Sequence, residues 1–193
     1  MNYRNRQHAF SLIELLVSMV IFSIGLLSIA GLQMVAKKSN HESLQRTTAS
    51  HIAYGLLEEM RTNGNGIMTY LAAPDLGGGQ FASLPVPDCN NAASPCTAGQ
   101  KATHDLWFWE QVLDGEQEVG AEGATGGILI PTLCIDGPAG GGAGTYAVAI
   151  AWRGSVSLEN SDIDVCGAGS GQYGDGDAYR RVLRVDTFID PNI

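Results

Sequence analysis

The stretch from Phe10 to Ala36, FSLIELLVSMVIFSIGLLSIAGLQMVA, is apolar throughout except for one carboxylate, Glu14. No charged residue follows Glu14 until Lys37, and the roughly 20 residues between them are enough for a helix to cross a bilayer. A short leader, MNYRNRQHA, precedes the stretch and carries Arg4 and Arg6 but no acid. A carboxylate in a membrane helix costs on the order of 3 kcal/mol on insertion scales. Glu14 therefore requires either a charged partner or a functional role that offsets this cost.

The composition limits what the rest of the chain can be. At 193 residues there is room for one anchor and one modest domain, since domains most often have about 100–150 residues. The chain carries 20 Asp and Glu against 11 Lys and Arg, a formal charge of −9. Loss of the leader would remove two of the 11 basic residues and leave 9. This acidic balance argues against a nucleic-acid partner, which requires a basic face.

Three interpretations of the N-terminal forty residues compete. A cleaved secretory signal has an apolar core of about 7–15 residues and a small-residue cleavage site, whereas this core is longer and LQMVAKKSN offers no A-x-A pattern. A plain signal anchor explains the length but leaves Glu14 unexplained. The flanking charges do not choose an orientation, because two basic residues precede the stretch and Lys37 and Lys38 follow it.

The third interpretation explains the carboxylate. The run AFSLIELLV, residues 9–17, resembles the class III signal of type IV prepilins and pseudopilins. The resemblance implies that a prepilin peptidase cuts between Ala9 and Phe10 and that the new N-terminal Phe10 is N-methylated. It also implies that Glu14 of one subunit neutralises the α-amino cation of a neighbour, in a setting where screening by water is weak. The family usually has Gly before the cut; Ala9 departs from that pattern and bears on how efficiently the site is processed.

The helix is predicted to continue beyond the membrane. Residues 37–62 contain no Pro, and the run Asn63-Gly64-Asn65-Gly66 is a strong stop, so one helix is expected from about Ser11 to Arg61. Gly25 and Gly31 are its weak points. A stripe that recurs every four residues suits burial against a globular head; it comprises Leu44, Thr48, Ile52, Leu56 and Met60, with Ala49 and Ala53 alongside. On the exposed side, Glu58 and Arg61 are spaced to form an ion pair.

Beyond this helix the chain is expected to be irregular as far as Gly127, except for a short helix from His104 to Leu113 that ends at Asp114-Gly115. Leu106, Trp109 and Leu113, with Val112 beside them, fall on one face of that helix. One face is enough to bury these side chains, so we interpret them as core anchors in preference to an adhesive aromatic patch.

Three strands are predicted after this helix, over residues 127–135, 145–153 and 181–189. Pro131 cannot donate to a ladder, which places the first strand at an edge or at a bulge. The second strand alternates, with Tyr146, Val148, Ile150 and Trp152 on one face and Ala147, Ala149 and Ala151 on the other. In the third, Leu183, Val185 and Ile189 oppose Arg184 and Asp186. The predicted fold class is α+β: a long N-terminal helix whose amphipathic half packs on a small antiparallel sheet, as in type IV pilins.

The four cysteines all follow the apolar stretch. They lack the paired C-x-x-C or histidine spacing of a zinc finger, so no metal site is expected. An even number beyond a membrane segment indicates two disulfides in an oxidising compartment, with isolated buried thiols as the alternative. Of the three possible connectivities, we favour Cys89 with Cys96, which closes a small loop, and Cys134 with Cys166, which ties two later strands.

The remaining polar residues show no catalytic constellation, so we expect neither an enzyme nor a cofactor. Histidines 8, 41, 51 and 104 lack metal-binding spacing, and His41 and His51 are expected at the surface. The glycine tracts lack the G-K-[ST] ending of a phosphate loop. An alternative for the acidic loop is calcium held by Asp175 and Asp177 near Asp162 and Asp164, although the spacing does not match an EF-hand.

The later segments narrow the resemblance. GLLEEMR at the end of the long helix, the Trp-bearing helix, and AVAIAWRG before VLRVDTFI resemble minor pilins of type IV pili. This resemblance implies a structural subunit that helps to initiate pilus assembly and supports twitching motility and surface adhesion. Its partners would be other minor pilins, the major pilin, the prepilin peptidase and the inner-membrane assembly machinery. It would lie in the inner membrane with a cytoplasmic N-terminus and a periplasmic head, and later in the extracellular pilus.

The expected organisation is a cleaved leader (1–9), a hydrophobic helix for the membrane and for assembly (10–36), an amphipathic continuation (37–62) and a globular head (63–193). Two alternatives stay open. One is a type II secretion pseudopilin. The other is a membrane-tethered binding module whose anchor is passive and whose Trp or Asp-rich loops recognise a ligand.

Overall fold

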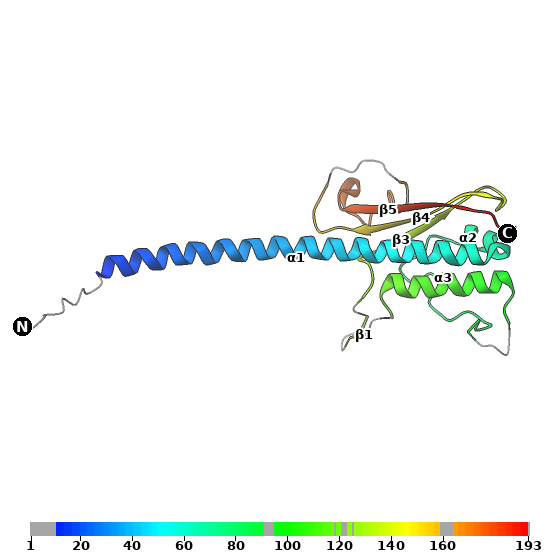
Figure 1. Cartoon of the computed structure of the whole chain (residues 1–193), viewed down its shortest axis with the longest axis horizontal. Coiled ribbons are helices and arrows are strands. Elements are labelled where there is room, and N and C mark those ends of the chain that lie inside the picture. The colour runs from blue at the N-terminus through cyan, green and yellow to red at the C-terminus, as the bar shows by residue number, and fades with distance from the viewer. Residues whose placement is uncertain are drawn as a thin grey trace, which may run out of the picture. The chain divides into compact units, whose positions relative to one another are not determined.

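The computed structural model describes residues 11–90, 95–117, 119–120, 123–124, 126–158 and 164–192. The chain divides into two compact units, residues 1–41 and residues 42–193, which we call the apolar unit and the head unit. One helix, α1 (Leu12–Thr62), contributes to both (Figure 1). The predicted long helix agrees with α1 to within one residue at each end, and the backbone is helical at Gly25 and Gly31.

Within the head unit, α1 buries one stripe of side chains. Ala49, Ile52, Ala53, Leu56 and Met60 are fully buried, as their spacing predicted. The stripe as predicted is wrong at its first position: Leu44 is exposed and Gln45 is buried instead. A four-residue spacing drifts by about 40° per step, whereas seven residues return to within about 20°, so Gln45 lies almost in line with Ile52 and Leu44 does not.

The sheet of the head unit has three antiparallel strands in the order β3-β4-β5. They are β3 (Thr132–Asp136), β4 (Gly144–Arg153) and β5 (Arg180–Ile189), and β4 pairs with β5 along its whole length. The first strand was predicted too long, because β3 begins only after Pro131. Proline has no backbone N–H to donate to the ladder, so the strand begins one residue after it. Because β3 lies at the edge of the sheet, a proline next to the strand is tolerated.

The two faces of β4 pack into different clusters. Tyr146, Val148, Ile150 and Trp152 join the main core with the buried stripe of α1. Ala149 and Ala151 on the opposite face pack with Cys166 and Tyr173. The alternation was predicted correctly, and the loop that carries Cys166 and Tyr173 explains why the alanine face is buried as well.

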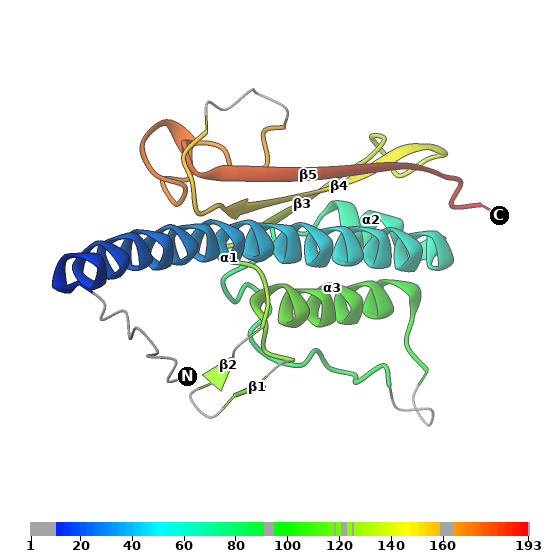
Figure 2. The ribbon, with the colours of Figure 1, turned by 60° about the vertical axis from the view of Figure 1, so that its left-hand side comes forward.

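Helix α3 (Ala98–Asp114) covers the other side of α1, and Figures 1 and 2 both show the head-unit half of α1 between the sheet and α3. Leu106, Trp109 and Leu113 are buried in the main core, as expected for core anchors. The helix begins six residues earlier than predicted, because Thr97 and Gln100 form a reciprocal capping box. It ends where predicted, at Gly115, whose φ of 81° is a left-handed conformation that glycine adopts without strain.

Five short elements were not predicted. They are η1 (Gly64–Gly66), α2 (Ile67–Leu71), β1 (Val119–Gly120), β2 (Gly123–Ala124) and η2 (Asp175–Asp177). Of these, α2 adds Ile67 and Tyr70 to the main core. The head unit is therefore a small antiparallel sheet on one side of an amphipathic helix with a second helix on the other, which confirms the α+β class.

Candidate assembly site

Glu14 lies in the first turn of α1, where the unpaired backbone N–H groups of the helix favour a negative charge. Its side chain is exposed, and its backbone N–H donates to the carbonyl of Ser11 at 3.0 Å. The predicted cleavage and methylation residues, Ala9 and Phe10, fall outside the described residues. Within the described chain, Glu14 is the first charged residue, and the next is Lys37.

The surface around Glu14 is continuously apolar. Every Leu, Ile, Val, Met and Phe from Leu12 to Val35 is exposed. The hydroxyls of Ser18, Ser23 and Ser28 donate to the carbonyls of Leu15, Met19 and Ile24 at 2.9, 2.7 and 2.9 Å. These serines are therefore satisfied within the helix, as a hydrocarbon environment requires.

By length and composition, α1 is the single helix among the described residues that is apolar enough to cross a membrane. An apolar helix surface with one exposed carboxylate has two chemical capacities. It can bury itself in lipid or in other apolar helices, and it can pair with one cation that arrives in the same environment.

The head unit holds its polar groups in internal networks. The Tyr70 hydroxyl donates to Asp105 at 2.5 Å, and Lys101 contacts both Asp105 and Glu59. Burial raises the pKa of Asp105, and the hydrogen bonds from Lys101 and Tyr70 only partly oppose this rise. Burial and the bond to Asp105 raise the pKa of the Tyr70 phenol as well. This network connects α2 to α3 and, through Glu59, to α1.

A second buried carboxylate organises the chain before α3. Glu110 is fully buried, and its carboxylate accepts hydrogen bonds from the backbone N–H groups of Gly77, Gln80 and Phe81. One turn later, Asp114 accepts from Gly78 and Gly79 at 3.1 Å. Backbone N–H groups that converge in this way form an anion site, and here two side chains of α3 fill it. The glycine tract therefore has a structural role.

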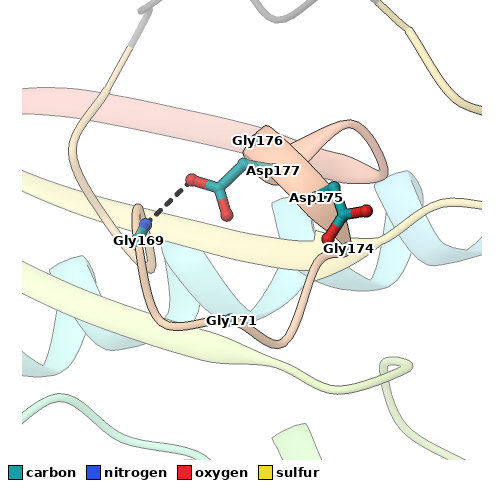
Figure 3. Close-up of a pocket in the computed structure, with 6 residues that line it drawn as sticks. All are labelled: Gly169, Gly171, Gly174, Asp175, Gly176 and Asp177. Carbon is teal, nitrogen blue, oxygen red and sulfur yellow. Dashed lines mark hydrogen bonds between the residues drawn. The ribbon is translucent and has the colours of Figure 1, made fainter.

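The acidic loop considered for calcium is shown in Figure 3. The carboxylate of Asp177 accepts from the backbone N–H of Gly169 at 2.8 Å and lies 3.8 Å from Nε of Arg180. Asp164 bonds instead to Arg184 and to the Cys166 amide, and Asp162 lies outside the described residues. Among the residues that the structure describes, no three His, Cys, Asp or Glu side chains are grouped to hold a metal ion.

Both disulfides have the pairing favoured from the sequence, Cys89–Cys96 and Cys134–Cys166. The second joins β3 to the loop that covers the alanine face of β4. The predicted pair of Glu58 and Arg61 is present at 2.5 Å, and Arg61 also donates to Thr187 of β5 at 2.7 Å. His41 and His51 are exposed, as expected, whereas His104 is buried beside Asn90.

Comparison with known protein families gives two matches, over adjacent stretches of the chain. Residues 4–30 match the prokaryotic N-terminal methylation motif, the signature of precursors that are methylated at a new N-terminus. Directly after it along the chain, residues 31–107 are similar to the family described as type IV pilin Tt1218. The two matches support a pilin structural subunit. No curated protein and no solved structure shows significant similarity to the chain.

The two family matches meet inside α1 and end within α3. The β-sheet therefore lies outside both matches, and its place in the molecule comes from the structure. The roles predicted for Ala9, Phe10 and Glu14 stay predictions, and the carboxylate-centred contacts of α3 were not predicted from the sequence. The G-G-G run at residues 77–79, with acids on a later helix, was the signal available for them.

Proposed function

We propose that the protein is a minor pilin of a type IV pilus, of the PilV kind, which helps to initiate pilus assembly and supports twitching motility and surface adhesion. One observation carries the proposal. Glu14 is a single exposed carboxylate at the start of a helix that is otherwise uncharged and apolar as far as Ala36, and the match to the methylation motif, residues 4–30, includes Glu14 and the first part of this helix.

Processing is the first step of the proposed function. A prepilin peptidase cuts between Ala9 and Phe10 and removes the basic leader, residues 1–9. Hydrolysis of this peptide bond leaves Phe10 with a free α-amino group, which is then N-methylated and keeps its positive charge. The cut thus creates a cation four residues before Glu14 along the chain.

Assembly then uses the opposite charges of two subunits. Two unit charges 4 Å apart attract by about 4 kcal/mol at an effective dielectric constant of 20, compared with about 1 kcal/mol in water. Glu14 of an incoming subunit pairs with the Phe10 ammonium of a neighbour, which offsets the cost of holding each charge in an apolar setting. Residues 10–36 serve as membrane anchor before assembly and as fibre core afterwards.

The proposed partners follow from this sequence of events. They are the prepilin peptidase, the inner-membrane assembly machinery, the major pilin and other minor pilins. The subunit begins as a single-pass protein of the inner membrane, with its N-terminus cytoplasmic and its head periplasmic, and ends in the extracellular pilus. The two disulfides support an oxidising compartment for the head, since such bonds are rare in the cytosol.

The proposal is tested by isolating surface fibres sheared from cells and probing them for this chain. We expect the chain in the fibre fraction of cells with an active prepilin peptidase, and in the membrane fraction alone when the peptidase is inactive. Ala9→Gly provides a matched variant, because it restores the residue that such signals usually have and should be cut at least as fast. A chain that never leaves the membrane would favour the tethered binding module, and a chain found in secretion-system fibres would favour a pseudopilin.

A further inference from the structure

Glu42, the first residue of the head unit, marks the end of that unit at which the chain enters it. Its Oε1 accepts from the backbone N and the Oγ of Ser155, both at 3.0 Å, and lies 3.6 Å from Nη2 of Arg181. Ser155 follows β4, and Arg181 is the second residue of β5. The chain therefore enters the head unit where β4 ends and β5 begins. We call this end the base of the head unit.

Two loops at the base expose aliphatic side chains. The loop before β3 carries Leu129 and Ile130, which are 47% and 38% exposed. The loop after β4 carries Val156 and Leu158, which are 48% and 54% exposed. The first loop lies against the end of β4, because the backbone N–H of Arg153 donates to the carbonyl of Leu129 at 3.0 Å, and the second loop begins directly after Arg153. Four exposed aliphatic residues gathered at one end of a domain indicate a contact surface.

Hydrogen bonds hold both loops in place. The carbonyl of Ile130 accepts from the Tyr173 hydroxyl at 3.2 Å, and the carbonyl of Val156 accepts from Arg181 at 2.5 Å. The backbone N–H of Leu158 donates to Ala178 at 2.9 Å. Ile130 also has a φ of 51°, a conformation that is unfavourable for a β-branched residue. Hydrogen bonds therefore fix the backbone that carries the exposed aliphatic side chains, and Ile130 adopts a strained conformation within it.

The two arginines at the base, Arg153 and Arg181, already have partners. Arg181 faces Glu42, while Arg153 donates to the carbonyl of Gln172 at 2.8 Å and lies over the ring of Tyr179 at 5.1 Å. Moving the aliphatic residues out of water would therefore not require an unpaired cation to follow them. The exposed Asp175 lies on the neighbouring loop, so an anionic surface is disfavoured.

The short connection between the apolar stretch and the head unit limits how far the base can lie from a membrane that holds the apolar stretch. Glu42 is only the sixth residue after Ala36, the last residue of the apolar stretch. Six residues span roughly 9 Å as a helix and at most about 20 Å when extended. The polar headgroup regions add roughly 10–15 Å in total to a hydrocarbon core of about 30 Å. Half of that total, about 5–8 Å, lies on each side of the core, so a helical connection of about 9 Å places Glu42 near the outer edge of the headgroup layer, from which side chains of the base can reach inward.

We propose that the base of the head unit is a lipid-contacting surface. Leu129, Ile130, Val156 and Leu158 enter the boundary between headgroups and acyl chains of the bilayer that holds α1, and they bind zwitterionic phospholipid through apolar contact. This inference rests on the proposed membrane insertion of residues 10–36. It adds a second membrane contact, made by the head, which must be released when the subunit leaves for a fibre.

The test uses the full chain reconstituted in phosphatidylcholine vesicles. All four native cysteines are disulfide-bonded, so one added cysteine gives a single labelling site for an environment-sensitive fluorophore. Val156→Cys and Leu158→Cys report on the base. Val86→Cys is the matched control on the head, because Val86 is 95% exposed on a loop outside the base. Ser28→Cys reports on insertion of the apolar stretch.

Spin-labelled lipid then quenches whatever probe lies in the membrane. We expect loss of fluorescence at positions 156 and 158 with labels near the headgroup, loss at position 28 with labels deep in the acyl chains, and none at position 86. Added phosphatidylglycerol should not increase quenching at the base. Quenching at position 28 with none at 156 and 158 overturns this inference and leaves insertion intact, whereas no quenching at position 28 overturns insertion itself. Base probes that become shielded only when other pilins are added would show that the surface faces protein.

Discussion

The indole ring of Trp109 fills the space beside Gly55. A Cβ atom built at Gly55 would lie 2.2 Å from Cη2 and 2.4 Å from Cζ2 of that ring. Trp109 belongs to α3 and Gly55 to α1, so the absence of a side chain at position 55 sets how closely the two helices approach. The packing of the head therefore depends on a glycine whose helix propensity is poor.

Gly55→Ala is expected to destabilise the head despite its better helix propensity. Overpacking costs typically about 1–3 kcal/mol, and the gain of alanine over glycine in a helix offsets about 1 kcal/mol of this. Thermal unfolding followed by near-ultraviolet circular dichroism would show a lower midpoint. Gly31→Ala is the matched control on the same helix, since a Cβ there meets nothing within 4 Å. If the two variants unfold at the same temperature as the wild type, the proposed contact does not limit the packing.

Removal of Cys134–Cys166 should cost more stability than removal of Cys89–Cys96. In the chain-entropy description the sequence separations of 32 and 7 correspond to about 4 and about 2.5 kcal/mol. The first bond also fixes the loop that covers the alanine face of β4. Paired Cys→Ser variants compared by denaturant unfolding provide the measurement, and equal losses would contradict the ranking.

We expect the head unit to lose stability at acidic pH as Asp164 becomes protonated. Burial alone would raise the pKa of its carboxyl, but bonds from Arg184 and the Cys166 amide, with the nearby positive charges of Arg184 and Arg180, bring the pKa below its usual value. A pKa that is lower in the folded state gives stability above the unfolded value of about 3.9, and this stability is lost as the pH falls through the folded value. The midpoint of the wild type should therefore fall more steeply below about pH 4 than that of Asp164→Asn.

For Asp105 we expect the dependence of stability on pH to have the opposite sign, in the same unfolding experiment. Burial raises its folded pKa above the unfolded value, so its contribution to stability decreases as the pH rises through the interval between the two. Asp105→Asn should flatten that part of the profile and leave the acid limb unchanged. Identical pH profiles for both variants would contradict the assignment of these two carboxyls.

Glu14→Ala should separate insertion from assembly. The substitution removes a group that costs on the order of 3 kcal/mol in a membrane helix, so the variant should insert at least as well as the wild type. It should be depleted from sheared fibres, because the α-amino group of a neighbour loses its partner. Glu14→Gln keeps the shape without the charge and should behave in the same way. Normal fibre incorporation of both variants would show that charge pairing at residue 14 is dispensable.

The sequence predicted the long helix well for two physical reasons. An uncharged apolar run and the Asn-Gly stop at residues 63–66 are both local signals, and both survive in α1. The stripe on its second half was predicted from a strict four-residue spacing, which drifts around the helix by about 40° per step. This is why Leu44 was expected in the core and is exposed.

The missed features depend on contacts between distant residues. Tyr70 meets Asp105, and Gly77 meets Glu110, across more than thirty positions of chain, and a local pattern such as the glycine run at residues 77–79 marks one side of a contact without identifying its partner. The early start of α3 differs, because the Thr97 and Gln100 capping box is a local signal that was present in the sequence. Of the candidate site, Glu14 was proposed from its sequence context, while the aliphatic base of the head needed the fold that places residues 129–130 and 156–158 at the same end of the head unit.

The N-terminus of the mature chain tests the central claim most directly. Intact-mass measurement with N-terminal fragmentation, made on protein extracted from membranes of cells with an active prepilin peptidase, reads both the cut and the methyl group. The account predicts a chain that begins at N-methylated Phe10 and retains Glu14 as its fifth residue. A chain that still begins at Met1 in those cells would contradict it.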